Sequence, residues 1–450
     1  MGSRPISNTY LAALISEAGL SNAALARHVN QLGAHRRYGE LRLRYDSSSV
    51  NRWLRGAVPD APTPALIAEV LSRRVNRRVT AAEVFAAGDA FLEFPTSASG
   101  AADSATALWR QTVHRRDFLT YAFMAGAGLE AGWRWAFAPA AAQVTATGRR
   151  RVGMADVERL LAARQDFADL DRRHGGGHAR AWLTDYLDRE VAPLLHGSYR
   201  DSVGRALFAA AAVLTETVSY MAFDDGDHGL AQRFSIQALA LAKQAGDAAF
   251  GSYVMSNMAA QLVYLGEGPK AAQVARAGWM TSQNAPAALL ARLHTTEARG
   301  HALAGETGEV RAALDRAAQA LDRAATQQAP EWLGASSPAH HAGSTMHCLF
   351  DLGRFAEAAR HGPAALDLPT DNVRARALHQ ILLARVQAGL GDVEHSCDTA
   401  RTALHAAARL RSRRLRERIR EYHGGLAAHR TAPVVQAWQD EARELLAAAA

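Results

Sequence analysis

Apolar side chains in residues 8–85 recur every three or four positions, which is the spacing of one-sided helices. Residues that favour helix starts, such as Asn8 and Ser21, alternate with glycines that favour helix ends, and together they divide the stretch into short segments. The connector at 34–46 contains the alternating run LRLRY, which is compatible with a small hairpin. The pattern predicts helices over residues 8–18, 21–33, 47–54, 62–74 and 80–85.

The third predicted helix has two different sides. Val50, Trp53 and Leu54 fall on one side and are expected to pack against the second and fourth helices. Asn and Arg side chains can bond base edges at two points, and the free N–H groups of a helix start can bind a phosphate. The other side is expected to present such groups to the DNA major groove, from Ser47, Ser48, Ser49, Asn51, Arg52 and Arg55.

Positive charge is concentrated in the same part of the chain. Residues 1–90 contain twelve arginines against seven acidic residues, and the net charge of the whole chain is only +7. The connector and the stretch after the fourth helix supply Arg36, Arg37, Arg42, Arg44, Arg73, Arg74, Arg77 and Arg78. These would attract the phosphate backbone of double-stranded DNA without reading its sequence. We therefore predict a helix-turn-helix DNA-binding domain over residues 1–92, against the plainer alternative of a small helical domain with a solvated arginine face.

From residue 154 onward the pattern becomes repetitive. Long helical stretches end in short turns that contain Gly229, Gly266, Gly305, Gly353 and Gly391. The interval is about 40 residues, and the one longer interval holds the insert TQQAPEWLGASSP. Helix pairs of this length cannot bury their own apolar stripes and therefore stack on one another. The predicted fold is all-α, with the helix-turn-helix domain followed by a tetratricopeptide (TPR)-like α-solenoid over 154–450.

Residues 93–153 are predicted to connect these two parts. Residues 93–112 are small and polar, which indicates a linker. In 115–150, Trp133, Trp135 and Phe137 indicate a packed segment, whereas the run PAAAQVTATGRRR indicates a mobile one.

Polar and aromatic residues on the first helices of successive repeats are candidates for a binding groove, since solenoids present a long concave surface. These residues are Tyr220, Asn257, Gln261, Tyr264, His294 and Arg299. We expect the groove to bind an effector, either a peptide or a small molecule, or a partner protein. A homodimer formed through the TPR-like domain is expected, because one recognition helix rarely gives enough affinity or specificity.

No catalytic or metal site is predicted. Three glycines separate His174 from His178 and prevent the helical spacing that would align two imidazoles, so a turn is expected there. The pairs His340–His341 and His347–Cys348 lack further ligands at suitable spacing. We expect no cofactor and no enzymatic activity.

The composition favours a cytoplasmic protein. Two cysteines in 450 residues cannot form a disulfide framework, which favours a reducing compartment. No run approaches about 20 uninterrupted apolar residues, and the first residues lack the apolar region of a signal peptide, so no membrane contact is expected. The segment HRRDFL at 114–119 resembles a twin-arginine export motif, but it lies behind a whole predicted domain.

Five segments carry a resemblance to a known family: SSVNRWLRG, RRDFL, DRRHGGGHAR, YMAFDDGDHGLAQRF and NMAAQLVYLG. With them the chain resembles actinobacterial, Streptomyces-type transcriptional regulators that join a Cro/repressor-type helix-turn-helix of the XRE family to tetratricopeptide repeats. Some members are negative regulators of sporulation and antibiotic production. The resemblance implies a cytoplasmic transcriptional regulator that controls development or secondary metabolism.

Three alternatives remain open at the level of the sequence. The repeats would form a protein-recruitment scaffold if the N-terminal domain, residues 1–92, did not bind specific DNA. The chain would be a hydrolase or metalloenzyme if the histidine clusters were functional. DNA binding would also suit a maintenance factor in plasmid inheritance or replication.

Overall fold

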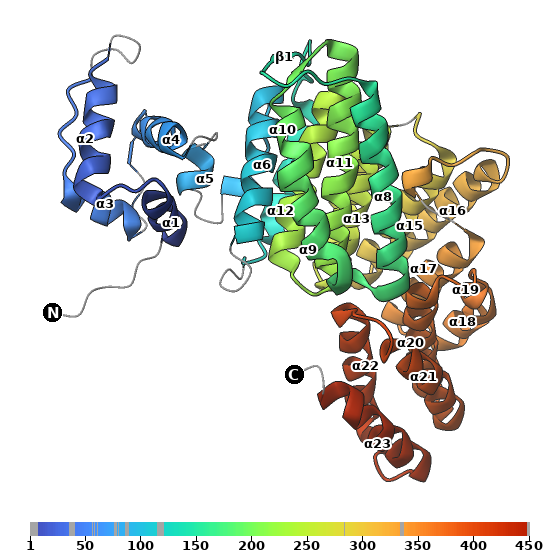
Figure 1. The fold of residues 1–450 in the computed structure, drawn as a ribbon. Helices are drawn as coiled ribbons and strands as arrows, with labels where there is room; N and C mark the ends of the chain where they lie inside the picture. Colours follow the sequence, from blue (N-terminus) through green and yellow to red (C-terminus); the bar gives the residue numbers. More distant parts are fainter. Residues whose placement is uncertain are drawn as a thin grey trace.

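The structure is a computed structural model, and it describes residues 8–35, 41–55, 57, 59–60, 62–75, 79, 81–85, 90–114, 121–282, 284–333 and 337–447. Among these residues the regular structure is almost entirely helical, which confirms the all-α prediction. Two short strands, β1 (Ala146–Thr147) and β2 (Ser198–Tyr199), form one antiparallel pair. Figure 1 shows a small group of N-terminal helices beside a large helical body.

The N-terminal group, here called the head, has its own apolar core around Trp53, separate from the core of the body. The predicted helix starts are correct, because the side chains of Asn8 and Ser21 accept hydrogen bonds from the first turns of their helices. The five predicted head helices are confirmed as α1 (Thr9–Glu17), α2 (Asn22–Gly33), α3 (Ser47–Leu54), α4 (Thr63–Arg74) and α5 (Ala81–Phe85).

The connector between α2 and α3 is held by one side chain. The Asn30 amide accepts a hydrogen bond from the Tyr45 N–H at 3.0 Å and donates to the Tyr45 carbonyl at 2.8 Å, as a neighbouring strand would. Leu41, Leu43 and Tyr45 are partly buried on the head core. The described parts of the connector, residues 34–35 and 41–46, contain no strand, so the hairpin is not formed there.

The body contains the remaining helices. It begins with the short turn η2 (Ala90–Leu92), followed by α6 (Ala98–His114), α7 (Ala125–Phe137), α8 (Met154–His174), α9 (Gly176–Tyr186), the π-helical turn η3 (Leu187–Val191) and α10 (Ala192–Leu195). It continues with α11 (Asp201–Asp224), α12 (His228–Ala245), α13 (Ala248–Tyr264), α14 (Gly268–Met280), α15 (Ala287–Leu303), α16 (Thr307–Ala324), η4 (Glu331–Leu333), α17 (Pro338–Asp351), α18 (Phe355–Arg360), α19 (Gly362–Leu366), α20 (Val373–Gly389), α21 (Val393–Ala407), α22 (Arg413–Gly425), η5 (Leu426–His429) and α23 (Pro433–Ala447).

The prediction of a linker at 93–112 is wrong. Most of that stretch is α6, which lies in the core of the body with Trp109 fully buried. α6 packs on α12 and α9. Its alanines, serines and glycine allow these helices to approach closely, so the small residues reflect dense packing and not flexibility.

Much of 115–150 is also packed against the body, and 115–120 lie outside the described residues. Trp135 of α7 is buried as predicted and lies over Gly251, where a Cβ atom would meet the indole at 2.0 Å. Trp133 and Phe137 instead stack on each other at the surface. The run that was expected to be mobile is anchored, because Arg205 donates to the carbonyls of residues 141 and 142 and strand β1 pairs with β2.

From α11 onward, consecutive helices pack in pairs joined by tight turns. The first helices of the pairs are α11, α13, α15, α17, α20 and α22. Glycines with positive φ form the turns within the first five pairs, at Gly226, Gly266, Gly305, Gly353 and Gly391. Four of these match the sequence repeat, and the first turn uses Gly226 in place of Gly229. Gly229 lies at the start of α12, where a Cβ atom would meet the Tyr121 carbonyl oxygen at 1.8 Å.

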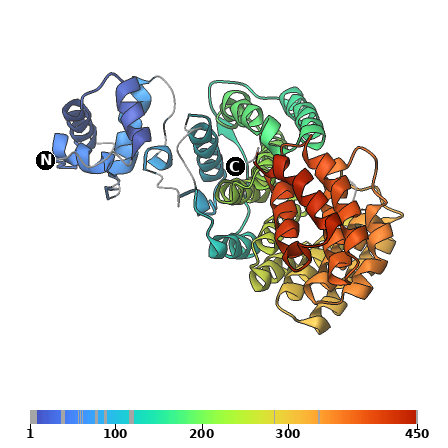
Figure 2. The same ribbon diagram turned by 90° about the horizontal axis from the view of Figure 1, so that it is seen from below.

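The stack of pairs curves until its last helices meet its first (Figure 2). α20 contacts α8, and α22 contacts α11. Arg374 of α20 donates to both carboxylate oxygens of Asp171 at 3.1 and 2.7 Å and to Asp224 at 2.9 Å. Ser412, the N-cap of α22, donates to Asp224 at 2.9 Å. We call these four buried residues the closure network; their charges are paired and hydrogen-bonded, as buried charges must be.

The predicted turn is confirmed at Gly175, between α8 and α9, but the glycines do not keep the imidazoles apart, because the His174 and His178 ring centroids are 4.8 Å from each other. The structure explains the three glycines. Gly177 N–H donates to the Arg411 carbonyl at 3.2 Å, and Arg411 N–H donates to the His174 carbonyl at 2.8 Å. Gly175 has a φ of +86°, and a Cβ atom there would meet the Arg411 carbonyl oxygen at 2.6 Å. The glycines therefore allow the strand-like approach of the segment that leads into α22.

α11 is the one helix, among the described residues, with the length and composition to cross a membrane. Of its most apolar 18-residue window, 78% is buried inside the body. Packing of this kind is typical of the central helix of a helical core.

Candidate functional sites

The α3 helix exposes most of the polar residues that the sequence singled out. Val50, Trp53 and Leu54 are buried, and the Trp53 ring meets Tyr45 edge-on at 5.0 Å. The exposed residues are Ser47, Ser48, Asn51, Arg52 and Arg55 on α3 and its C-cap, with Arg42 and Arg44 on the connector. We call these seven residues the α3 surface. Arg36, Arg37, Arg77 and Arg78 lie outside the described residues.

Ser49 does not face outward, so its assignment to the α3 surface is wrong. It is only 5% exposed, and its N–H and hydroxyl groups both donate to the Asp46 carboxylate at 2.9 Å. Ser49 is the third residue of the helix, the N3 position of a capping box, and this position turns toward the cap and not toward solvent. The Asp46 carboxylate thus occupies an N–H group that was expected to bind phosphate.

Asp46 places a negative charge at the start of α3. Hydrogen bonds from the Ser48 hydroxyl and then from the Ser49 N–H and hydroxyl lower its pKa to about 2. The carboxyl group is therefore ionised at neutral pH.

The polar end of Asn51 is held in place, whereas the α3 arginines are free. Asn22 of α2 donates to the Asn51 side-chain oxygen at 2.9 Å, which leaves the Asn51 NH2 group available. Within the described residues, Arg52 and Arg55 form no ion pair. Oriented amide and unpaired guanidinium groups thus share one exposed surface.

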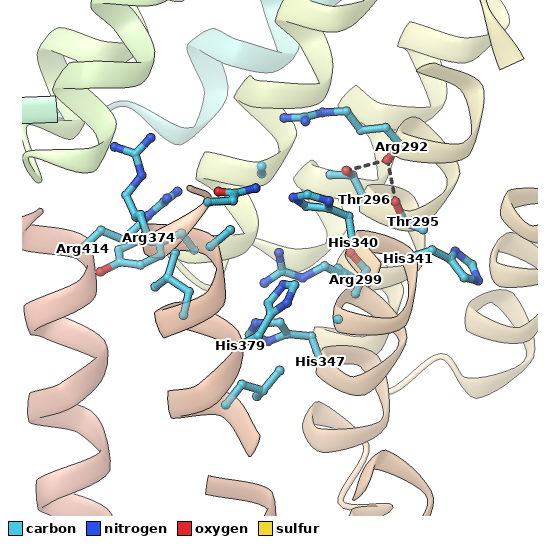
Figure 3. Close-up of a pocket in the computed structure, with 18 of the residues that line it drawn as sticks. Arg292, Thr295, Thr296, Arg299, His340, His341, His347, Arg374, His379 and Arg414 are labelled. Carbon is cyan, nitrogen blue, oxygen red and sulfur yellow. Dashed lines mark hydrogen bonds between the residues drawn. The ribbon is translucent and has the colours of Figure 1, made fainter. Parts of the chain in front are cut away.

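A second candidate site is a pocket of about 480 Å³ on the inner side of the curved stack. The first helices α11, α13, α15, α17, α20 and α22 all contribute to its walls (Figure 3). Asp371 is the one carboxylate among its lining residues. The basic lining consists of Arg172, Arg292, Arg299, Arg374, Arg385, Arg414 and Arg418, together with His340, His341, His347 and His379.

Four of the six predicted groove residues line this pocket: Tyr220, Asn257, Tyr264 and Arg299. Two do not, so their assignment to the groove is wrong. Gln261 donates to the His228 carbonyl at 2.8 Å and supports the turn before α12. His294 faces the other side of α15, with Glu297 at 3.5 Å and the Trp279 ring at 5.1 Å. A helical repeat shows which helix faces the groove, but not which side of that helix.

Several of the pocket arginines pair with carboxylates that do not line the pocket. Arg374 and Arg414 pair with Asp224, at 2.9 and 3.4 Å. Arg385 and Arg418 share Glu421, at 3.2 and 2.7 Å. Arg374 and Arg414 also lie over the Tyr220 ring, and Arg418 lies 4.0 Å from the centre of the Tyr264 ring. These guanidinium groups help to hold the walls together.

Arg292 and Arg299 of α15 are less well compensated. Arg292 donates to Ser256 at 2.9 Å and to Asn257, which in turn donates to the buried Glu216. Burial raises the pKa of Glu216 to about 7, so this carboxyl is only partly ionised. Arg299 forms no hydrogen bond or ion pair within the described residues, and its Nε is buried without a partner.

The pocket histidines are neutral at pH 7. Burial, followed by nearby His379 and Arg292, lowers the pKa of His340 to about 4. Burial, followed by Arg299 and Arg418, holds the pKa of His347 well below its ordinary value. Sequence reasoning considered His340, His341 and His347 only as metal ligands and did not consider His379. No grouping suited to a metal is found among the described residues. The signal that could have placed them in the pocket was their position on first helices of the repeats, the same class of helix that carries Arg299.

The SP15 N-terminal domain family matches residues 11–85, a range that begins in α1 and ends with α5. No curated protein matches the chain.

Proposed function

We propose that the chain is a DNA-binding transcriptional regulator controlled by an effector in the basic pocket. The observation that carries the proposal is the α3 surface, where Asn51, Arg52 and Arg55 are exposed on a helix anchored by Trp53. In this proposal α2 and α3 form a helix-turn-helix of the XRE type, and the helix pairs form a TPR-like solenoid. The protein acts as a cytoplasmic homodimer without cofactor or enzymatic activity, and the resemblance in sequence suggests control of development or secondary metabolism.

The residues of the α3 surface would have two kinds of role. Asn51 and Arg52 can form paired hydrogen bonds with adenine and guanine edges in the major groove. Arg42 and Arg44 of the connector would contact phosphates and fix the position of the head on the duplex. The first group would give sequence specificity, and the second would give salt-dependent affinity.

A packed route leads from the pocket toward the head, whose last helix α5 contacts α6 of the body, which packs on α12. Tyr220 and Phe223 of α11 line the pocket, and α11 is paired with α12. Gln237 of α12 donates to the carbonyls of Phe91 and Glu93, at 2.9 and 3.2 Å, just after the head. An effector that favours one arrangement of α11 and α12 would change how the two heads of a dimer are spaced.

The test uses the purified full-length chain. A bound sequence is first selected from random duplex DNA, and affinities for it and for scrambled DNA are then measured by fluorescence anisotropy across a range of salt. Arg52→Ala is expected to reduce the discrimination between the two duplexes about tenfold or more. Arg42→Ala is expected to weaken both about equally and to lower the salt slope by about one. Arg189→Ala, an exposed arginine of the body, is the control and should change neither.

Failure to select any sequence, with no steep salt dependence, would reject the proposal in favour of a protein-recruitment scaffold. Selection of a sequence followed by equal behaviour of all three variants would reject α3 as the recognition helix. If chromatin pulldown places the sites at replication origins or partition loci, the protein is a DNA-maintenance factor.

A further inference from the structure

The pocket contains a positive charge that nothing in the described protein neutralises. Arg299 is set back in the wall, makes no ion pair, and is influenced by the Asp351 carboxylate only from beyond ion-pair distance. Burial lowers the pKa of its guanidinium. A buried cation without a partner costs stability, and ionisable groups perturbed in this way cluster at functional sites.

Imidazoles from two other helices lie in the same part of the pocket as this guanidinium. Figure 3 shows Arg299 of α15 with the rings of His340 and His347 of α17 and of His379 of α20 around it. The His379 ring fits only because residue 343 is glycine, where a Cβ atom would meet the imidazole Nε2 at 2.4 Å. We call Arg299, His340, His347 and His379 the Arg299 cradle.

We propose that the pocket binds a phosphorylated small molecule of about nucleotide size, with a phosphate group held by the Arg299 cradle. A phosphate carries close to two negative charges and three acceptor oxygens, so it can be approached by donors from several sides. The cradle offers a forked guanidinium and the imidazoles of His340 and His347 as donors, whereas a single carboxylate would need little more than the guanidinium. His379 donates its Nδ1–H to the Ala365 carbonyl at 2.7 Å, so its ring lines the cradle and supplies a donor to phosphate only when it is protonated. A volume of about 480 Å³ lies within the range of small-molecule sites.

The closure of the stack argues against an extended peptide as the ligand. The Arg374 pairs with Asp171 and Asp224 join the two ends of the curved array, so the concave surface is a bounded pocket and not an open groove. Arg292 lies two turns along α15 from Arg299, with its partner Asn257 beside the buried Glu216. It can contact a second polar part of the ligand.

Because it names the ligand of the effector pocket, this inference rests on the proposed function for its regulatory meaning. Binding itself is measured without DNA. Isothermal titration calorimetry of the full-length chain would use pyrophosphate, inorganic phosphate and adenosine triphosphate as phosphate probes, with adenosine as a neutral probe and citrate as a phosphate-free anion. At least one phosphate probe is expected to saturate one site per chain, and adenosine is not.

Three variants locate the site. Arg299→Gln is expected to weaken phosphate binding at least tenfold and, because it removes an unpaired buried charge, to leave the Tm of the free protein equal or higher. Arg311→Gln, an exposed arginine on α16, is the matched control and should bind as the parent does. Arg52→Ala should also bind as the parent, which excludes the basic head as the source of the signal.

The inference is overturned if no phosphate probe binds, if citrate binds as tightly as pyrophosphate, or if Arg299→Gln binds unchanged. Saturable, Arg299-dependent binding by a protein that selects no DNA would support the inference and reject the proposed regulator. Specific DNA binding without any phosphate binding would support the proposed regulator and overturn the inference.

Discussion

At the scale of single residues, Asp46 has two opposing effects on the proposed DNA contact. Its carboxylate caps α3 and fixes Ser48 and Ser49, which keeps the first turn of the helix in place. The same charge lies beside the exposed Arg44 and Ser48, where a DNA phosphate would approach. The carboxylate therefore stabilises the helix but would weaken the attraction of this surface to DNA.

Replacing Asp46 with Asn separates the two effects. Asn also caps helices well, so Asp46→Asn is expected to leave the Tm of the head nearly unchanged and to strengthen DNA binding a few-fold, most clearly at low salt. Asp46→Ala should also remove the repulsion but lower the Tm by several degrees, because the cap is lost. Anisotropy with selected DNA and thermal unfolding provide the two readouts. Unchanged affinity in Asp46→Asn would show that no phosphate lies near the start of α3.

Sequence reasoning found the anchoring side of α3 but not the behaviour of its first turn. The spacing of Val50, Trp53 and Leu54 fixes which side is buried, because it follows from helical geometry alone. Ser49 was misplaced because its serine hydroxyl has a partner in its own cap. Local hydrogen bonds of this kind compete with the simple division into apolar and polar sides.

At the scale of elements, the glycines between α8 and α9 determine how closely the stack can close. A Cβ atom at Gly176 would meet the Met221 carbonyl oxygen at 2.5 Å, and the Gly176 N–H donates to Asp224 of the closure network. α9 and α11 must therefore be in near contact at the point where the C-terminal helices join them. The glycines are structural parts of the closure.

Gly176→Ala is expected to loosen this junction. The added methyl group should destabilise the protein by about 1–3 kcal/mol and increase hydrogen exchange in α22. Gly424→Ala in α22 is the matched control, since a Cβ atom there would enter open space and alanine is the better helix former by up to about 1 kcal/mol. Equal exchange in the two variants would mean that the glycine contact does not hold the ends together.

The sequence predicted the helix pairs well and their wider packing poorly. Glycine turns such as Gly305 and Gly391 can be recognised in the sequence, because each repeat must reverse the chain at the same point. α6 was taken for a linker because its small residues also occur in flexible segments. The closure depends on pairs such as Arg374 with Asp171, which are far apart in sequence, and no local pattern specifies them.

At the scale of the whole molecule, the basic pocket makes the free energy of unfolding depend on pH. His340, His341, His347 and His379 all have pKa values lowered chiefly by burial, with nearby positive charges contributing. The folded protein therefore holds these imidazoles neutral at pH values where the unfolded chain would protonate them. Their contribution to stability is complete above pH 6.5 and is lost as the pH falls toward the folded-state values.

The free energy of unfolding is thus expected to decrease on acidification from pH 7.5 to 5. His340, with a pKa of about 4 against an ordinary 6.5, would account for a decrease on the order of 1–3 kcal/mol by pH 4. Urea unfolding at several pH values measures the effect, and His340→Gln should flatten the curve between pH 6.5 and 5. Glu216, with its pKa raised to about 7, opposes this decrease in both proteins, so the difference between the two curves is the readout. A His340→Gln curve parallel to that of the parent would contradict the assignment of a neutral imidazole.

The closed stack also has a consequence for biosynthesis. The walls of the pocket include Arg172 of α8 as well as Arg414 and Arg418 of α22, so nearly the whole polypeptide must leave the ribosome before the cavity exists. The head needs nothing beyond α5 to complete its core. Under the proposed function, a nascent or C-terminally shortened chain would therefore carry a finished head that no small molecule could control. Premature stop codons would then uncouple the two proposed activities instead of abolishing both.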